Sequence, residues 1–143
     1  MAGVSLISPL TDSRIGASTP ADEVNARLAT IAKWNVVIGE LLRMRALADD
    51  WDGKGASAPK AENVDTAIIV VQRMQAYASA IPPSQAVPGV SGEVLLVWQN
   101  EGLFLEAEIC SADQIEWMSS ANGQPTRHWT TDAAVPCFVG RAS

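Results

Sequence analysis

The chain has little positive charge and few of the residues that build catalytic or metal centres. Its 143 residues include ten Lys and Arg against sixteen Asp and Glu, with one His and two Cys, and the net charge is −6. Proteins that bind nucleic acid neutralise phosphates with clustered Lys and Arg, and acidic membrane surfaces attract the same residues. The composition therefore argues against nucleic acid and membranes as direct partners. It leaves open a basic protein partner, or an enzyme surface that normally meets nucleic acid.

Targeting and membrane-spanning signals are also missing. Residues 1–18 have neither a basic start nor a long apolar stretch, so they do not resemble a secretory signal peptide. The apolar run at residues 66–71 is far shorter than the roughly 20 residues that cross a bilayer. Two cysteines, Cys110 and Cys137, suit a reducing cytoplasm, which is the compartment we expect. The sequence leaves open whether they pair.

A hydrophobic fraction of 48% supports a packed core in a single domain of this length. We expect residues 1–18 to form a flexible N-terminal tail, residues 19–130 a single α+β domain and residues 131–143 a C-terminal tail. No internal repeat interrupts this organisation.

Two helices are predicted in the first half of the domain. The first runs from Pro20 to about Ala48, because Thr19 suits an N-cap and acids follow in the first turn. Its helical spacing predicts an apolar stripe that a second set of residues widens: Val24, Leu28, Ile31, Ile38 and Leu42, then Trp34, Val37, Leu41 and Met44.

The second helix is predicted from Pro59 or Lys60 to about Ala80, where Ile81-Pro82-Pro83 ends it. One of its faces is apolar, and Ile69 and Val70 make a further side apolar. We expect this helix to be covered on more than one side, either by the first helix and a sheet or by a second copy of the chain in a homodimer.

After Gly89 the pattern changes to that of strands. Four are predicted, separated by turns at Gly102, at residues 111–113 and at Asn122-Gly123: Glu93–Gln99, Leu103–Ile109, Gln114–Ser119 and Thr126–Thr130. Pro125 places the last strand at an edge. The predicted fold is α+β, with two antiparallel helices packed on one face of a four-stranded antiparallel β-meander.

Alternation along the second strand assigns its two faces. Leu103, Leu105, Ala107 and Ile109 should lie on the helices, while Glu106 and Glu108 point outward beside Phe104, joined by Glu116 from the next strand. Glu93 is considered with these three acids, because paired carboxylates are the catalytic groups of glycosidases. The alternatives are a solvated acidic surface and a protein-binding surface with Phe104 among the acids.

The Asp-rich turn at residues 49–59 joins the two helices. An EF-hand that placed Asp52 and Gly53 at its fifth and sixth positions would begin at Ala48 and end at Pro59, which lack carboxylates. A Walker loop needs Ser or Thr after the Lys, and Gly55 follows Lys54. We therefore expect Trp51 to be buried in the core and Asp52 to bind the turn's backbone, with a ligand contact at Trp51 and Asp52 as the alternative.

No catalytic, cofactor-binding or metal-binding set is predicted. His128 is the only histidine, and neither Cys110 nor Cys137 has a local catalytic signature around it. One His and two distant Cys are a weak metal-ligand pattern.

The run Trp51-Asp52-Gly53-Lys54-Gly55-Ala56, with its downstream helix, resembles a group of small, largely uncharacterised bacterial and phage proteins. They share a Trp-Asp-Gly-x-Gly-Ala turn, a following Pro, a helix, a strand that ends in Trp as at Trp98, and an acidic alternating strand like Leu105–Ile109. The resemblance covers roughly Leu41–Trp117. It implies a related fold and a bacterial or phage origin, and it implies no activity.

Three functions remain open from the sequence. The favoured one is a non-catalytic interaction module, of the inhibitor, antitoxin or immunity kind, that binds a basic partner through its acidic surface. The second is a small hydrolase or ligand-binding protein that uses the acidic sheet face. The third is a self-associating structural module built on the second helix.

Overall fold

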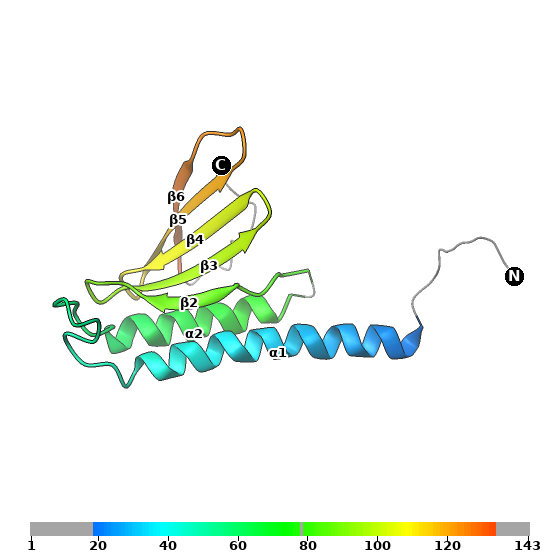
Figure 1. Cartoon of the computed structure of the whole chain (residues 1–143), viewed down its shortest axis with the longest axis horizontal. Coiled ribbons are helices and arrows are strands. Elements are labelled where there is room, and N and C mark those ends of the chain that lie inside the picture. The colour runs from blue at the N-terminus through cyan, green and yellow to red at the C-terminus, as the bar shows by residue number, and fades with distance from the viewer. Residues whose placement is uncertain (1–18, 78, 134–143) are drawn as a thin grey trace, which may run out of the picture. The chain divides into compact units, whose positions relative to one another are not determined.

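The computed structural model describes residues 19–77 and 79–133. Two helices come first: α1 (Pro20–Met44) and α2 (Ala61–Gln75). Five strands follow: β2 (Gln85–Pro88), β3 (Val94–Asn100), β4 (Leu103–Ile109), β5 (Gln114–Ala121) and β6 (Arg127–Asp132). Each strand pairs antiparallel with the next in chain order (Figure 1). The protein is therefore α+β, and the described sheet has five strands where the sequence predicted four.

The additional strand, β2, lies in a segment that the sequence pattern assigned to a break after the second helix. Two prolines precede it and Pro88 ends it, which hides a short strand from a pattern search. Pro88 is tolerated because β2 is an edge strand and needs ladder hydrogen bonds on one side only. At its other side the backbone N–H of Ala86 donates to the Glu40 carboxylate at 2.8 Å.

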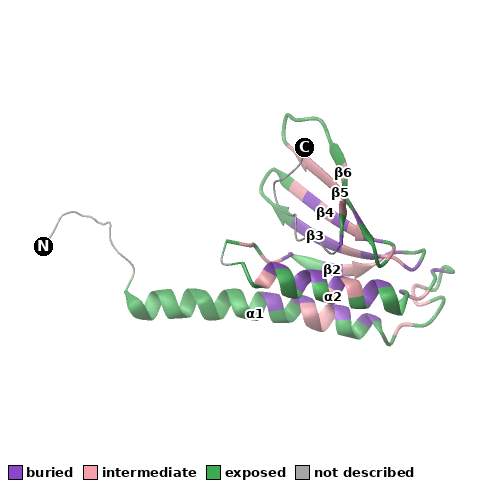
Figure 2. Ribbon diagram, turned by 180° about the vertical axis from the view of Figure 1, so that it is seen from behind, coloured by how far each residue is buried: buried purple, intermediate pink, exposed green. Residues whose placement is uncertain are grey.

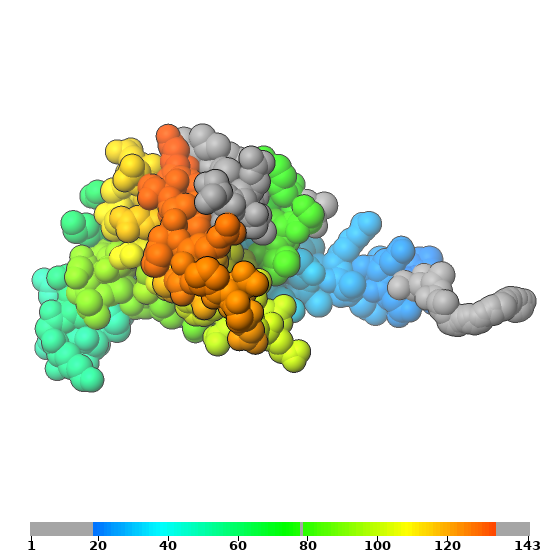
Figure 3. Space-filling model, turned by 90° about the horizontal axis from the view of Figure 1, so that it is seen from above, coloured from blue at the N-terminus to red at the C-terminus, as the bar shows by residue number. Residues whose placement is uncertain are grey.

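At the opposite edge of the sheet lies β6, as Pro125 predicted, and its orange-to-red atoms are at the surface in Figure 3.

The two helices are shorter than predicted at their C-terminal ends. Beyond Met44 the backbone N–H groups of Arg45, Ala46 and Leu47 bond three residues back, which closes the helix as a turn. The N–H groups of Ala76 and Tyr77 do the same after α2. Strand β4 has the predicted bounds, and β6 continues two residues past the predicted Thr130.

The chain divides into two compact units, residues 1–32 and 33–143. In the first, residues 19–32 begin α1, and all of them are exposed. Thr19 caps the helix as predicted, because its hydroxyl accepts from the Asp22 N–H at 3.1 Å while the Asp22 carboxylate accepts from the Thr19 N–H at 3.3 Å.

Within the second unit, α1 buries a different stripe from the one at the centre of the prediction. Trp34, Val37, Leu41 and Met44 are buried, whereas Leu42 is 48% exposed. In the first unit Val24, Leu28 and Ile31 are exposed as well. Helix α1 carries two apolar stripes, and their periodicity alone does not show which of the two is buried.

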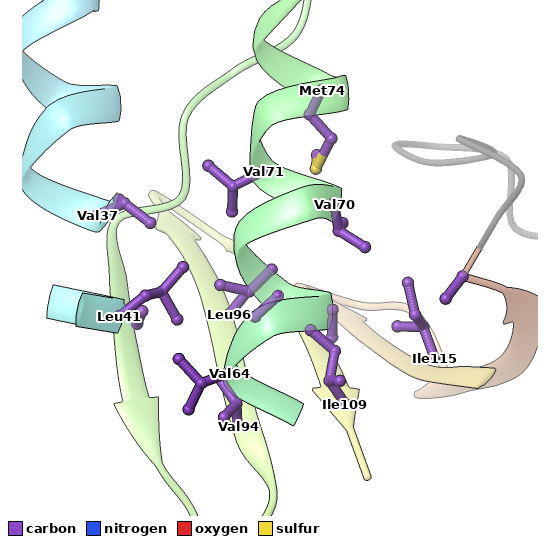
Figure 4. Close-up of a cluster of buried hydrophobic side chains, with 14 of the residues drawn as sticks. Val37, Leu41, Val64, Val70, Val71, Met74, Val94, Leu96, Ile109 and Ile115 are labelled. Atoms are coloured by element: carbon purple, nitrogen blue, oxygen red, sulfur yellow. The ribbon is translucent and has the colours of Figure 1, made fainter. Parts of the chain in front are cut away.

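Helix α2 packs on β3 and β4 and forms the centre of the core. Val64, Val71 and Met74 are fully buried, and Val64 and Val71 lie close to Leu41 and Leu96 (Figure 4). Val70 is also buried in this core, which leaves Ile69, 46% exposed, as the large apolar side chain on the outside of α2. The expected second apolar side of this helix is thus reduced to one residue.

The helix-facing, or inner, face of the sheet is only partly covered. Figure 2 shows both buried and exposed residues along the sheet. Leu105, Ala107 and Ile109 are buried as predicted, but Leu103 is 47% exposed. The prediction for Leu103 is wrong because α2 contacts β3 and β4 and leaves this end of the sheet open. Towards β6 the inner face instead carries three stacked tryptophans, with ring centroids 5.9 Å apart for Trp98–Trp117 and 6.0 Å for Trp117–Trp129.

Neither helix in the described part of the chain has the length and apolarity of a membrane-spanning segment.

Candidate functional site

The sheet's outer face gathers the acidic residues that the sequence singled out. Glu108 pairs directly with Glu116 across β4 and β5, and Glu106 is two residues from Glu108 on the same face. Phe104 lies on this face as well, half-buried and two residues before Glu106. The register therefore brings together four of the six predicted site residues on one surface, which we call the acidic face.

Glu93 joins this cluster, although it was not among the six predicted interaction residues. It stands just before β3, and its carboxylate helps to raise the pKa of Glu108, so the two carboxyl groups lie close together. The backbone N–H of Ser91 also donates to Glu93 at 2.6 Å, and the space beside Gly89 is filled by the Glu93 side chain. Its odd position relative to Leu95 and Val97 was the signal available in the sequence, because alternate residues of a strand share a face.

The cluster is electrostatically strained. Partial burial raises the pKa of Glu108, and the neighbouring carboxylates of Glu93, Glu116 and Glu106 raise it further. Like charges placed directly opposite on adjacent strands are destabilising. None of the four glutamates forms an ion pair with a described residue, and the ion pair seen in this part of the chain, Arg45–Asp65, lies elsewhere.

A hollow of about 270 Å³ lies within the acidic face. Its lining includes Glu106, Glu108, Glu116, Met118 and His128. Met118 pairs with Glu106 on one side and with His128 on the other, which sets an apolar side chain between an acid and the imidazole. The hollow therefore combines the negative charge of the glutamates with the apolar side chain of Met118.

The strain predicts a pH dependence of stability. A raised pKa in the folded state means that Glu108 holds its proton more tightly when folded, so its stabilising contribution is complete below the ordinary glutamate pKa of about 4.3 and is lost as pH rises through the raised folded pKa. We expect Glu108→Gln to raise the melting temperature at neutral pH and to have little effect below that ordinary pKa. Thermal melts across this range, with Glu101→Gln at an exposed turn position as the control, test the expectation. If Glu108→Gln changed the melting temperature equally at neutral pH and below the ordinary glutamate pKa, the expectation would be contradicted.

The Asp-rich turn is held by its own backbone. The Asp52 carboxylate accepts from the N–H groups of Lys54 at 2.8 Å and Ala56 at 3.0 Å, and these bonds lower its pKa. Asp49 accepts from Ala58 N–H and Asp50 from Gly55 N–H, at 2.8 and 2.7 Å. The prediction that Asp52 binds the turn's backbone is confirmed.

Trp51 is not the core residue that the sequence predicted. It is half-buried, and its Nε1–H donates to the Ser57 carbonyl at 2.9 Å, so the indole ring links the two ends of the turn. Gly53 and Gly55 adopt φ of 73° and 87°, as expected. The side chains of Trp51 and Asp52 thus bond to the backbone of the turn and lie outside the acidic face.

Cys110, the cysteine in the described part of the chain, is not activated as a nucleophile. Burial and the carboxylates of Glu116 and Glu108 raise the pKa of the Cys110 thiol, whose Sγ lies 3.7 Å from Glu116 Oε2. The neutral thiol is a poor nucleophile. Cys137 lies outside the described residues, so the structure does not test whether it pairs with Cys110. Among residues 19–77 and 79–133, no three His, Cys, Asp or Glu side chains are grouped as metal ligands.

No protein-family model, no curated protein and no solved structure matches this chain. The resemblance of its turn and strands to small bacterial and phage proteins therefore stays a prediction.

Proposed function

We propose that this protein is a non-catalytic interaction module, of the inhibitor, antitoxin or immunity kind, that binds a cationic segment of a partner protein on the acidic face. The observation that carries the proposal is the uncompensated cluster of Glu93, Glu106, Glu108 and Glu116. Among the described residues no Lys or Arg neutralises it. A cationic partner would relieve a repulsion that the isolated chain retains.

The shape and chemistry of the hollow support a Lys or Arg side chain as the group that enters it. Such a side chain combines an aliphatic stem with a charged head. Met118 offers the stem an apolar contact, while Glu106, Glu108 and Glu116 surround the position of the head. Charge-assisted hydrogen bonds to carboxylates are among the stronger polar contacts in proteins. Phe104, half-buried nearby, adds apolar area to the same surface.

Binding of a short peptide rich in Lys and Arg tests this proposal. We expect the peptide to bind the wild-type protein at low ionic strength, with an affinity that falls as salt is raised, because exposed charges are screened over about 10 Å at 0.1 M salt. The double variant Glu106→Gln/Glu116→Gln should bind roughly two- to thirtyfold more weakly, at exposed-pair energies of about 0.2–1 kcal/mol for each of the two charges. Calorimetric titration measures both effects.

A charge-matched control separates the acidic face from net charge. Glu62→Gln/Glu101→Gln removes the same two charges from exposed positions outside the hollow and should leave binding close to wild type. Equal losses in the two double variants, or no binding of the basic peptide by the wild-type protein, would count against the proposal.

One observation favours a second candidate, a hydrolase that uses the acidic face. Partial burial and the surrounding carboxylates raise the pKa of Glu108, and a carboxyl group that keeps its proton beside ionised carboxylates is the arrangement of a general acid and its partner. Turnover of chromogenic glycosides, esters or phosphoesters that is abolished by Glu108→Gln, and not by Glu62→Gln, would establish this function and displace the first.

A further inference from the structure

A groove of about 760 Å³ lies at the end of the inner sheet face that α2 leaves uncovered. Trp98, Leu105 and Trp129 belong to its lining, together with Val36 of α1 and Ile81 from the segment before β2. Its volume falls in the range of about 300–1,000 Å³ that is typical of small-molecule sites.

Several large apolar side chains line this groove and remain exposed to solvent. Val36 is 57% exposed, Ile81 is 63% exposed and Leu103 is 47% exposed, and all three line the same space. Exposed apolar side chains that are scattered singly are ordinary, whereas a contiguous patch marks a binding surface. The patch therefore predicts a ligand with a substantial apolar body.

The charged residues of the lining, Lys33 and Arg127, are both cations. No Asp or Glu is among the lining residues in the described part of the chain, and neither cation forms an ion pair there. Arg127 is on the inner face with the apolar residues, because it pairs with Ser119, which in turn pairs with Leu105. This positive charge at one apolar groove contrasts with the chain as a whole, whose net charge is −6.

We infer that this groove binds a small amphipathic carboxylate, a molecule with an apolar chain and one carboxylate group. The Arg127 guanidinium offers a planar fork for the carboxylate, and Lys33 adds a second positive charge. The apolar chain lies over Trp98 and Leu105 towards Ile81. The same sheet repels such an anion from its acidic face, so the two faces select ligands of opposite charge.

Titration of the full-length protein with dodecanoate, kept below its micelle concentration, tests this site. A change in intrinsic tryptophan fluorescence, to which Trp98 and Trp129 of the groove contribute, reports occupancy, and calorimetry gives the affinity. We expect dodecanoate to bind at least about tenfold more tightly than dodecyltrimethylammonium, which has the same chain and the opposite charge. Arg127→Gln should weaken dodecanoate binding about tenfold or more, since a hydrogen-bonded charge is lost.

Two further variants keep the result interpretable. Lys54→Gln removes one positive charge from the exposed turn and should leave dodecanoate binding unchanged. Leu103→Ser, at a position exposed enough to spare the fold, should weaken binding of dodecanoate and of neutral dodecanol alike.

Absence of dodecanoate binding, or binding that Arg127→Gln and Leu103→Ser leave unchanged, would overturn the inference. A wild-type dimer that Leu103→Ser converts to monomer would overturn it too, since a second copy of the chain would then occupy the groove. These outcomes do not bear on peptide binding at the acidic face, which is measured with a different probe.

Discussion

Replacing Trp117 by alanine is expected to lower the free energy of unfolding by about 3–5 kcal/mol, which is the range for truncating a large aromatic in a core. Trp117 is 2% exposed and lies between two other rings, at 28° to Trp98 and nearly parallel, at 4°, to Trp129. Its Nε1–H donates to the Thr131 hydroxyl at 2.7 Å. The substitution removes both stacking contacts and leaves a cavity that α2 does not reach to fill. Urea denaturation followed by far-UV circular dichroism measures the loss.

Trp51→Ala is the matched control, because it removes the same side chain from a half-buried position outside the core. We expect it to cost less than half of the Trp117→Ala effect. Should the two substitutions cost the same, Trp51 would be the core residue that the sequence suggested and the position of the ring in the turn would be wrong. Trp117→Phe, which keeps one aromatic ring in place, should recover most of the stability.

Leu41→Ala is expected to cost about 2–5 kcal/mol, as for other fully buried leucines. The Leu41 side chain has no exposed area and lies among α2 and the sheet, close to Val64, Val71 and Leu96 (Figure 4). Truncation removes its contacts and leaves a cavity between elements that are fixed by the rest of the core. Equilibrium unfolding in urea tests the prediction.

The neighbouring residue gives the sharpest control. Leu42 is 48% exposed, so Leu42→Ala should change stability by less than about 1 kcal/mol. The pair distinguishes the two apolar stripes of α1 directly. A larger effect at Leu42 than at Leu41 would show that α1 is rotated about its axis relative to the structure described above.

Local signals in the sequence were sufficient for much of the architecture. The cap at Thr19, the turn at Gly102 and the strict alternation of Leu103–Ile109 each depend on neighbours a few residues away. The bonds from the turn's backbone to Asp52 are of the same kind. Such features are encoded in short segments, so the sequence could predict them.

The acidic face was also within reach of the sequence, in part. Alternation along one strand places Glu106 and Glu108 together, and the expected hairpin brings Glu116 beside them. Alternation also places Glu93 on the face of Leu95 and Val97, but its close approach to Glu108 depends on the conformation of residues 89–93 before β3, where the Ser91 N–H donates to it. That conformation is not visible in a pattern of apolar residues.

The sequence by itself determined that this chain is α+β, with two helices before an antiparallel sheet, and that its outward face is acidic. Only the tertiary structure decided which stripe of α1 is buried, that β2 adds a fifth strand, that Trp51 lies beside the turn, and that Leu103 stays open beside Arg127. The reason is physical. Periodicity reports which residues of one element share a face, whereas burial depends on which other element covers that face and how far along it the cover extends.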